Sequence, residues 1–297
     1  MRTEGVKIAI GADVGGTKIM AGAINSGGRV VAGPVTAATG GNDSSEIIFE
    51  RIAGTIEAVI TKSDPGKISG IGLGVTGPLD LEKGIILECP QLPTMHFFPL
   101  KEKIEERFNL PVMMDNDANA LLLGESIYGA GRGHRIVLGY TLGTGLGCAL
   151  VIDNKLFTGT NGMACEVWPS PDGEGIIEET LSGNGVSVIY SKMSGTQRSS
   201  AEIAELARKG DKNAIETWSL FGKKMADAIS WGINITDPGI VILGGSIANS
   251  IDLFSPAMEE RLRKFICPVP AGKTKVVKAE LGDLSGFIGA AALVFQH

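Results

Sequence analysis

The stretch Asp13-Val-Gly-Gly-Thr-Lys18, entered from the apolar residues 7–12, decides the fold. Apolar residues resume at 18–24 and, after another turn, at 29–35. Short apolar runs separated by glycine turns are typical of antiparallel strands. The sequence therefore predicts three strands joined by tight turns at the start of the chain.

The same arrangement returns near the middle of the chain. A second apolar run, residues 136–141, enters Leu142-Gly-Thr-Gly-Leu-Gly147 and continues into the apolar residues 148–152. This repetition predicts two similar sheets, each begun by a hairpin that contains glycine and threonine.

The remaining elements are predicted from the hydrophobic period. Residues 44–61 should form a helix, because isoleucines recur on one face and because Asp43 and Glu46 have the spacing of a capping box. We expect further strands at 68–75, 110–114, 240–243 and 275–279, and further helices at 99–109, 119–128, 178–193, 200–208, 213–235, 251–265 and 285–295.

Length and composition narrow the class of protein. The chain has 297 residues, 43% of them hydrophobic and 20% charged, which is enough for a large core and for roughly two lobes of ~150 residues each. The formal net charge is -6 and no block rich in Lys or Arg is present, so nucleic-acid binding is not expected.

Neither export nor membrane insertion is expected. No apolar stretch reaches the ~20 residues of a spanning helix, and residues 1–7 carry charges rather than a secretory apolar segment. A cytoplasmic location is therefore predicted. No C-x-x-C pair occurs, so we expect reduced packing residues rather than disulfides or a zinc site at the four cysteines, Cys89, Cys148, Cys165 and Cys267.

The two glycine turns are candidate phosphate sites. Backbone N–H groups at a turn without side chains can approach a phosphate closely, and Gly15-Gly16-Thr17 and Gly143-Thr144-Gly145 each add a hydroxyl. Neither is a Walker loop or a dinucleotide turn. One such turn alone favours an ordinary hairpin, but two turns at the head of duplicated sheets favour phosphate binding.

Two charged residues flank the first turn. Asp13 ends a strand just before it, where a carboxylate can hold Mg²⁺ directly or through water. The alternative is an aspartate that only bonds the backbone of its own turn. Lys18 is either a phosphate contact or a solvated lysine on an exposed strand.

The segment Asp115-Asn116-Asp117-Ala-Asn119 lies between a predicted strand and a predicted helix. Ligand sites of α/β sheets concentrate at such strand ends, and phosphoryl transfer needs a base beside the acceptor hydroxyl. The alternative is that Asn116 or Asp117 merely caps the helix. Four polar residues exceed what one cap requires.

Further candidates lie in the second half. Glu166 and Glu178 are carboxylates that can accept hydrogen bonds from sugar hydroxyls, whereas Glu179 is interpreted as a surface acid. The strand that ends in Gly244-Gly245 is a candidate shelf for an adenine ring, or only a tight turn.

Together these residues resemble the ROK family (repressors, open reading frames and kinases), which includes bacterial glucokinases, fructokinases and N-acetylmannosamine kinases. The resemblance spans nearly the whole chain through five motifs, Asp13-Val-Gly-Gly-Thr-Lys18, Gly74-Val-Thr-Gly-Pro-Leu-Asp80, Asn116-Asp-Ala-Asn119 with Gly124-Glu125, Leu142-Gly-Thr-Gly-Leu-Gly147 and Val241-Ile-Leu-Gly-Gly245.

The resemblance implies an α/β, actin-like ATPase fold, related to ribonuclease H, with two lobes and a cleft between them. We expect an N-terminal lobe of residues 1–115 plus 284–297 and a C-terminal lobe of residues 116–283. The homodimer is a family expectation.

The resemblance also implies residue roles. Asp117 is the implied base, and Asn116, Glu166, Glu178 and Gly77 are the implied sugar contacts. The implied ATP and phosphate contacts are Asp13, Gly15, Gly16, Thr17, Lys18, Gly143, Thr144, Gly145, Gly244 and Gly245, with Mg²⁺ at Asp13.

The chain departs from the family in its zinc region. Many members have Gly-Glu-x-Gly-His followed by a cysteine cluster, whereas this chain reads Cys165-Glu-Val-Trp168-Pro169 and then Asp172-Gly-Glu-Gly-Ile-Ile-Glu178. No structural zinc is expected, and packing of Trp168 is one way to hold the loop instead. The family's Asn-Leu-Pro-Gly-Trp segment is altered as well, to Gln91-Leu-Pro-Thr-Met95.

The predicted function is ATP-dependent phosphorylation of a hexose or amino sugar by a glucokinase-like transferase. An alternative is a weakly active or inactive sugar sensor, although a first strand near Lys7 leaves no room for a DNA-binding helix-turn-helix. An actin-like ATPase or chaperone is a further alternative, disfavoured by the Asn-Asp-Ala-Asn segment and the sugar-type carboxylates.

Overall fold

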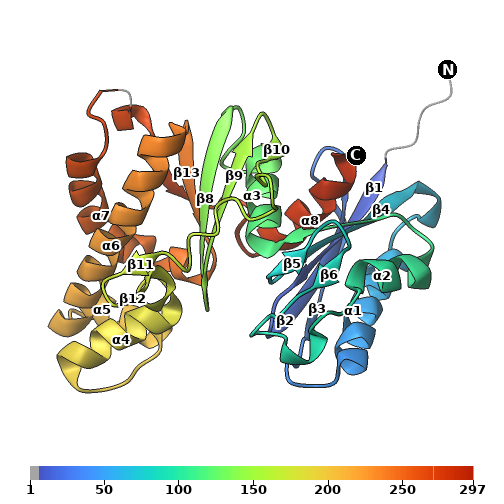
Figure 1. Ribbon diagram of the computed structural model, residues 1–297, viewed down its shortest axis with the longest axis horizontal. Coiled ribbons are helices and arrows are strands. Elements are labelled where there is room, and N and C mark those ends of the chain that lie inside the picture. Colours follow the sequence, from blue (N-terminus) through green and yellow to red (C-terminus); the bar gives the residue numbers. More distant parts are fainter. Residues whose placement is uncertain (1–6, 270, 297) are drawn as a thin grey trace. The chain divides into compact units, whose positions relative to one another are not determined.

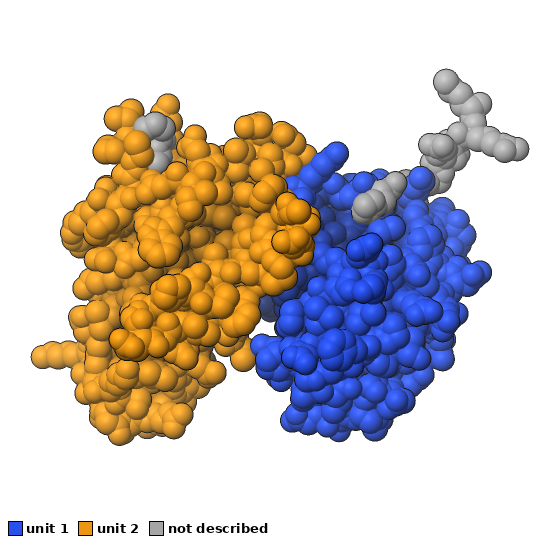
Figure 2. Space-filling model, viewed as in Figure 1, with its two compact units in different colours: residues 1–132, 154–156, 280–297 blue, residues 133–153, 157–279 orange. Residues whose placement is uncertain are grey.

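The computed structural model describes residues 7–269 and 271–296. The chain forms two compact units, which Figures 1 and 2 show as ribbon and space-filling views. Unit 1 comprises Met1–Arg132, Asn154–Leu156 and Glu280–His297, and unit 2 comprises Gly133–Asp153 and Phe157–Ala279.

The sheet of unit 1 has the order β3-β2-β1-β4-β7. Its first three strands pair antiparallel, as the opening sequence predicts, and β4 and β7 extend the sheet in parallel with β1. The strands are β1 (Ile8–Val14), β2 (Lys18–Asn25), β3 (Val30–Ala38), β4 (Ile68–Val75) and β7 (Val112–Asn116).

The two faces of this sheet are covered by different helices. Alternate residues of β1, such as Ile10, share a core with the isoleucines of α1 (Ser45–Ile60). On the opposite face, Gly11 and Gly72 lie against the backbone of α8 (Ser285–Phe295), where a side chain would collide with carbonyl oxygens. The glycines therefore let α8 approach the sheet closely.

Helix α3 (Asp117–Tyr128) packs against α8 in unit 1. Gly124 of α3 lies against Gly289 of α8, so the two backbones come close. Glu125 is buried and its carboxylate accepts hydrogen bonds from Ser285 Oγ (2.8 Å) and from the backbone N–H of Leu281 (2.8 Å). These contacts tie α3 to the start of α8.

The boundary between the units therefore differs from the sequence prediction. That prediction assigned residues 116–283 to the C-terminal lobe, but residues 116–132 and 280–283 lie in unit 1. The glycine contact and the Glu125 hydrogen bonds explain the difference, because both join α3 to the last helix of the chain.

Shorter elements complete unit 1. Ser44 caps α1, and its side chain accepts from the N–H of Ile47 (3.4 Å). Asp43, predicted to be the cap, instead pairs with Arg51 (2.6 Å). The remaining elements are α2 (Leu100–Phe108), β5 (Leu79–Asp80), β6 (Ile85–Ile86), β10 (Lys155–Leu156) and the 3-10 turns Pro65–Lys67, Pro93–Met95 and Gly282–Leu284.

The sheet of unit 2 repeats the plan of unit 1. Strands β8 and β9 form an antiparallel hairpin, and β13 and β14 continue in parallel from β8. Its long strands are β8 (Ile136–Leu142), β9 (Leu146–Ile152), β13 (Ile240–Gly244) and β14 (Lys275–Lys278), and the short strand β10 completes the sheet order β10-β9-β8-β13-β14. The predicted duplication of a hairpin followed by parallel strands is confirmed.

The helices of unit 2 enclose a core built on three buried rings. Trp218 and Phe221 of α6 pack against Phe254 of α7, with ring centroids 5.2 to 6.0 Å apart. The elements are α4 (Gly183–Ser194), α5 (Ser200–Arg208), α6 (Lys212–Thr236), α7 (Ile251–Phe265), β11 (Pro171–Asp172), β12 (Gly175–Ile176) and the 3-10 turns Ile177–Glu179, Ser246–Ser250 and Ala271–Lys273.

All four cysteines have free thiols, and Cys89 and Cys148 are buried packing residues, whereas Cys267 is exposed. Within residues 7–269 and 271–296, none of the helices has the length and apolar character needed to cross a membrane.

Candidate active site

The first glycine turn is a tight hairpin between β1 and β2. The N–H of Gly15 donates to the carbonyl of Lys18 (3.0 Å), and the hydroxyl of Thr39 donates to the carbonyl of Gly15 (2.6 Å). Gly16 lies against Gln91, so that an added Cβ would stand 2.7 Å from Gln91 Cβ. Thr17 and Lys18 are exposed at the tip of this hairpin.

Asp13 lies at the carboxyl end of β1, in contact with Gly286 at the start of α8. Burial, together with the negative charge of Asp117, raises the pKa of Asp13 to about 7, although the charge of Lys18 opposes the shift. A cation beside Asp13 would favour the ionised carboxylate.

Asn116 and Asp117 have separate roles at the start of α3. Asn116 is the helix cap, with its Oδ1 accepting the N–H of Ala118 (2.9 Å). Asp117 Oδ1 also lies 2.8 Å from that N–H. The protein around the Asp117 carboxyl desolvates it, and this burial raises its pKa above the usual 3.8. Asn116 is therefore the residue that caps the helix, as one sequence interpretation proposed. Asp117 is a carboxyl group whose pKa is raised.

The other polar residues of this segment support it. Asp115 is buried and its Oδ1 accepts from Asn119 Nδ2 (2.7 Å) and from the N–H of Asn116 (2.7 Å). Gly77 lies beside Asn116, because an added Cβ would stand 3.1 Å from Asn116 Nδ2. Asp115 thus fixes the loop from which Asp117 projects.

Strand pairing brings the unit 1 candidates to one edge of the sheet. Asp13 and Asp115 both pair with Gly74, on either side of β4. The carboxyl ends of parallel strands are where α/β sheets bind ligands. Asp13, Asn116 and Asp117 therefore lie at the same end of the sheet, where the parallel strands have their carboxyl ends.

The second glycine turn joins β8 and β9 in unit 2. The N–H of Gly143 donates to the carbonyl of Gly145 (3.0 Å), and the carbonyl of Gly143 accepts the N–H of Gly183 (2.8 Å) at the start of α4. Thr144 at the tip is exposed. An added Cβ on Gly143 would meet nothing within 4 Å, so this turn is open at Gly143.

Gly244 and Gly245 lie next to the same turn. Gly244 pairs with Thr141 at the end of β8. Gly245 has a φ of 81° and lies against the carbonyl of Leu142, a position that only glycine accepts readily. Unit 2 therefore brings Gly143, Gly244 and Gly245 together.

Glu178 bonds directly to the second hairpin. Its Oε2 accepts the N–H of Leu146 (2.8 Å), and the carboxylate lies against Gly145. Helix α4 begins at Gly183, later than the predicted 178, because Ser182 caps it by accepting the N–H of Gly185 (3.2 Å). Glu178 thereby remains outside the helix and can reach the hairpin.

Glu166 lies in the loop that departs from the family pattern. The indole Nε1 of Trp168 donates to Glu166 Oε2 (2.7 Å), and the carbonyl of Trp168 accepts the N–H of Glu178 (3.3 Å). Trp168 therefore contacts the carboxylate of Glu166 and the backbone of Glu178. Glu179 is exposed, as interpreted from the sequence.

An ion pair anchors the same loop to α6. Asp172 Oδ2 accepts from Lys224 Nζ (2.6 Å) and from Thr180 Oγ1 (2.6 Å). Burial alone would raise the pKa of Asp172, but these hydrogen bonds and the charge of Lys224 outweigh it and lower that pKa. Across residues 7–269 and 271–296, no three His, Cys, Asp or Glu side chains are grouped as a metal site.

The absence of such a cluster from residues 7–269 and 271–296 is compatible with Mg²⁺ binding at Asp13. Magnesium is usually held by one or two carboxylates plus water and substrate phosphates rather than by an all-protein cage. A single carboxylate with a raised pKa at the end of β1 fits that donor set.

Several site residues were not predicted from the sequence. Thr39, Gln91 and Lys224 come from distant segments and carry no local signal of their contacts. One sequence signal was available: a serine before a helix often caps it, so Ser182 marks the start of α4 at Gly183. That start lies beside the second hairpin, because the N–H of Gly183 donates to the carbonyl of Gly143.

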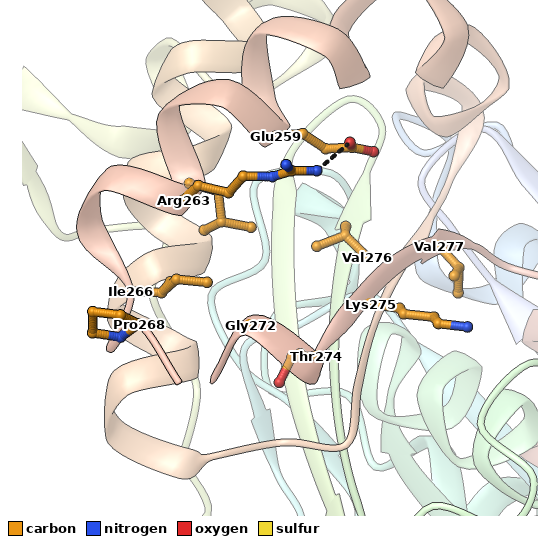
Figure 3. Close-up of a pocket in the computed structure, with 10 residues that line it drawn as sticks. Glu259, Arg263, Ile266, Pro268, Gly272, Thr274, Lys275, Val276 and Val277 are labelled. Carbon is orange, nitrogen blue, oxygen red and sulfur yellow. Dashed lines mark ion pairs between the residues drawn. The ribbon is translucent and has the colours of Figure 1, made fainter. Parts of the chain in front are cut away.

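A separate cavity of about 740 Å³ lies between α7 and β14 (Figure 3). Arg263 and Lys275 contribute to its lining. Arg263 forms an ion pair with Glu259, with 3.8 Å between Nη2 and Oε2. None of the predicted site residues lines this cavity.

The duplicated sheets, each headed by a glycine hairpin, define the actin-like ATPase fold, so the predicted fold class is confirmed. The chain belongs to the ROK family, whose model matches residues 9–297. This membership confirms the resemblance predicted from the motifs.

Comparisons with individual proteins agree with membership of the ROK family. The chain is 31% identical to a glucokinase of Thermotoga maritima, over 97% of each chain. It is 32% identical to an N-acetyl-D-glucosamine kinase of Photobacterium profundum, over 82% of this chain and 87% of the relative. A ROK glucokinase of Streptomyces griseus, solved with glucose and AMPPNP, superimposes with a TM-score of 0.83 at 29% identity and covers 98% of this chain and 100% of its own.

Proposed function

We propose that this sugar kinase transfers the γ-phosphoryl group of Mg-ATP to a hydroxyl of a hexose or N-acetylhexosamine, with Asp117 as the general base. The observation that carries the assignment is the buried carboxyl group of Asp117 at the start of α3. Asn116 and Asp117 Oδ1 both accept the N–H of Ala118, so the second carboxylate oxygen of Asp117 is the one proposed to accept the proton. Its raised pKa makes it a stronger base than an ordinary aspartate.

The chemistry follows from these side chains. Asp117 accepts the proton of the sugar hydroxyl while that oxygen forms a bond to the γ-phosphorus. The bond from the γ-phosphorus to the bridging oxygen breaks, and ADP leaves. Asp13 is the residue that would hold Mg²⁺, whose charge would neutralise the phosphate oxygens. The protein contributes mainly position and a proton acceptor.

Each unit supplies part of the proposed contact set. In unit 1, Asn116 and Gly77 lie side by side and are the proposed sugar contacts nearest the base. In unit 2, Glu166 and Glu178 are the proposed acceptors for sugar hydroxyls, because carboxylates bond such hydroxyls strongly.

The proposed phosphate contacts are the tips of the two hairpins. The N–H groups of Gly15 and Gly143 are already used inside their turns. The proposed donors are therefore the N–H groups of the next residues, Gly16 and Thr144, together with the exposed hydroxyls of Thr17 and Thr144. Lys18, also exposed, is a proposed phosphate contact, and Gly244 and Gly245 are the proposed shelf for adenine.

The substrate class is tested by following ADP release with a panel of sugars. Glucose, N-acetylglucosamine and N-acetylmannosamine are the first choices, since similar proteins are named glucokinase and N-acetyl-D-glucosamine kinase. We expect sugar-dependent ADP release with at least one of them. Binding of a sugar without ADP release would instead support the sensor alternative. The homodimer and the cytoplasmic location stay predictions.

A further inference from the structure

Trp168 joins the two carboxylates that the proposed sugar site takes from unit 2. Its indole N–H donates to Glu166 Oε2 over 2.7 Å, and its main-chain carbonyl accepts the N–H of Glu178 over 3.3 Å. A hydrogen bond to a charged carboxylate is among the stronger ones, and a neutral donor holds the carboxylate without cancelling its charge. Trp168 thus holds the carboxylate of Glu166 by its side chain and the main chain of Glu178 by its backbone.

The backbone around Glu166 is shaped for this contact. Cys165 has a φ of 67°, in the left-handed region, and its carbonyl accepts the N–H of Val167 (2.7 Å). The chain therefore turns sharply at Glu166, and the side chains of Glu166 and Trp168 meet although only Val167 lies between them. The carbonyl of Val167 accepts the N–H of Ser170 (2.9 Å), which continues the turn past Trp168.

The far side of the loop is also fixed. The N–H of Ile177 donates to the carbonyl of Ser170 (2.8 Å), and Asp172 is held by Lys224. Glu178 is fixed at its other end by the N–H of Leu146. The loop is therefore anchored on α6 and on the hairpin, and Trp168 is the residue through which Glu166 shares that anchorage.

We propose that Trp168 is a positioning residue that orients Glu166 and Glu178 for sugar binding, in a loop braced by hydrogen bonds and an ion pair. This inference rests on the proposed function, because it assumes that both carboxylates receive the sugar. The indole ring is 38% exposed, so its removal costs less packing than the loss of a core tryptophan such as Trp218.

The first test measures the KM for sugar of a variant in which an aromatic ring remains at position 168. Trp168→Phe removes the N–H donor but retains an aromatic side chain. We expect the KM for sugar to rise about tenfold, the expected size for one hydrogen bond to a charged group. The KM for ATP and the melting temperature should change little. The matched control is Trp231→Phe, at a tryptophan of α6 that is 62% exposed, and it should leave every constant unchanged.

A double variant separates positioning from general damage. If Trp168 acts through Glu166, then Glu166→Ala with Trp168→Phe should bind sugar no more weakly than Glu166→Ala alone, because alanine has no acceptor for the indole N–H. Losses that simply multiply would overturn the inference, as would a Trp168→Phe enzyme with an unchanged KM for sugar.

A spectroscopic measurement tests the contact independently of turnover. In protein labelled with ¹⁵N-tryptophan, the Trp168 indole signal is assigned by its absence in Trp168→Phe. It should move in Glu166→Ala, which removes the acceptor, while the other two indole signals stay in place. An unmoved signal would contradict the hydrogen bond. If the wild-type protein binds no sugar at all, the proposed function and this inference fail together; if it binds sugar and Trp168→Phe binds it equally well, only this inference fails.

Discussion

The two glycine hairpins begin equivalent sheets but are held in different ways. The hairpin of unit 1 is enclosed, because Thr39 bonds its backbone and Gln91 lies against Gly16. The hairpin of unit 2 is open at Gly143, and its second strand begins with an N–H bonded to the carboxylate of Glu178. The first hairpin is thus fixed by neutral groups, and the second by a proposed sugar-binding residue.

This difference has a consequence for binding. Because Glu178 contacts both the second hairpin and the Trp168 carbonyl, the proposed phosphate turn and the proposed sugar loop of unit 2 form one hydrogen-bonded assembly. The first hairpin has no such link to a sugar carboxylate through Thr39 or Gln91. Changes at the second hairpin should therefore alter the KM values for both substrates, and changes at the first should act on ATP.

The largest effect should come from Gly16→Ala. The added methyl group would stand 2.7 Å from Gln91 Cβ and 2.8 Å from the Gln91 carbonyl oxygen, which is backbone and cannot rotate away. We expect a loss of stability of about 1–3 kcal/mol and a KM for ATP raised at least tenfold. Thermal unfolding and steady-state kinetics measure these two quantities. A fully stable variant with a normal KM for ATP would show that the first hairpin is not enclosed.

Gly145→Ala should have a smaller and different effect. Its methyl group would stand 2.5 Å from Glu178 Oε2, at the end of a side chain that can move. We expect little change in melting temperature but a several-fold rise in the KM for sugar as well as for ATP, because the displaced carboxylate loses Leu146. A rise in the KM for ATP alone would break the proposed link.

Glu178→Ala and Glu178→Gln sharpen the same point. Glutamine keeps a carbonyl acceptor for the N–H of Leu146, whereas alanine leaves that donor without its partner. Both variants should weaken sugar binding, but only alanine should also raise the KM for ATP. Equal effects of the two variants on ATP would contradict the role of Glu178 at the hairpin.

The smallest effect concerns the ion pair that anchors the loop. The folded-state pKa of Asp172 is lowered, so the pair stabilises the protein above the unfolded value of 3.8 and loses that contribution as the pH falls through the lower folded pKa. Lys224→Met should therefore cost about 0.5–1 kcal/mol at pH 7. The difference from wild type should shrink in acid, which denaturant titrations at pH 7 and pH 3 would show. A constant difference would argue against an ionic contribution.

The regular elements of the chain were predictable because their signals are local. Helices α5, α7 and α8 and strand β4 begin and end at the predicted residues, because apolar runs and their spacing mark them, and a capping box also marks the start of α5. The place of α3 in unit 1 was not predictable in this way. It depends on Glu125 and on a glycine contact with a helix more than 150 residues later, and neither has a periodic signature.

The candidate site shows the same limit. Strand ends and glycine turns located Asp13, Asp117 and both hairpins, because these positions follow from strand order. The supports of the site were not located, since Gln91 and Lys224 act across long sequence separations. The sequence suggested packing for Trp168, whereas in the structure its indole N–H donates a hydrogen bond to Glu166.

The most direct test of the account is the rate of phosphoryl transfer by Asp117→Asn in a single turnover, with ATP binding measured in parallel. We predict a rate at least about 100-fold lower, with ATP affinity retained, because asparagine cannot accept the proton. In the wild-type enzyme, activity should fall in acid as Asp117 is protonated, at a pH above the ordinary 3.8 because burial raises its pKa. Near-normal transfer by Asp117→Asn would contradict the assignment of Asp117 as the base.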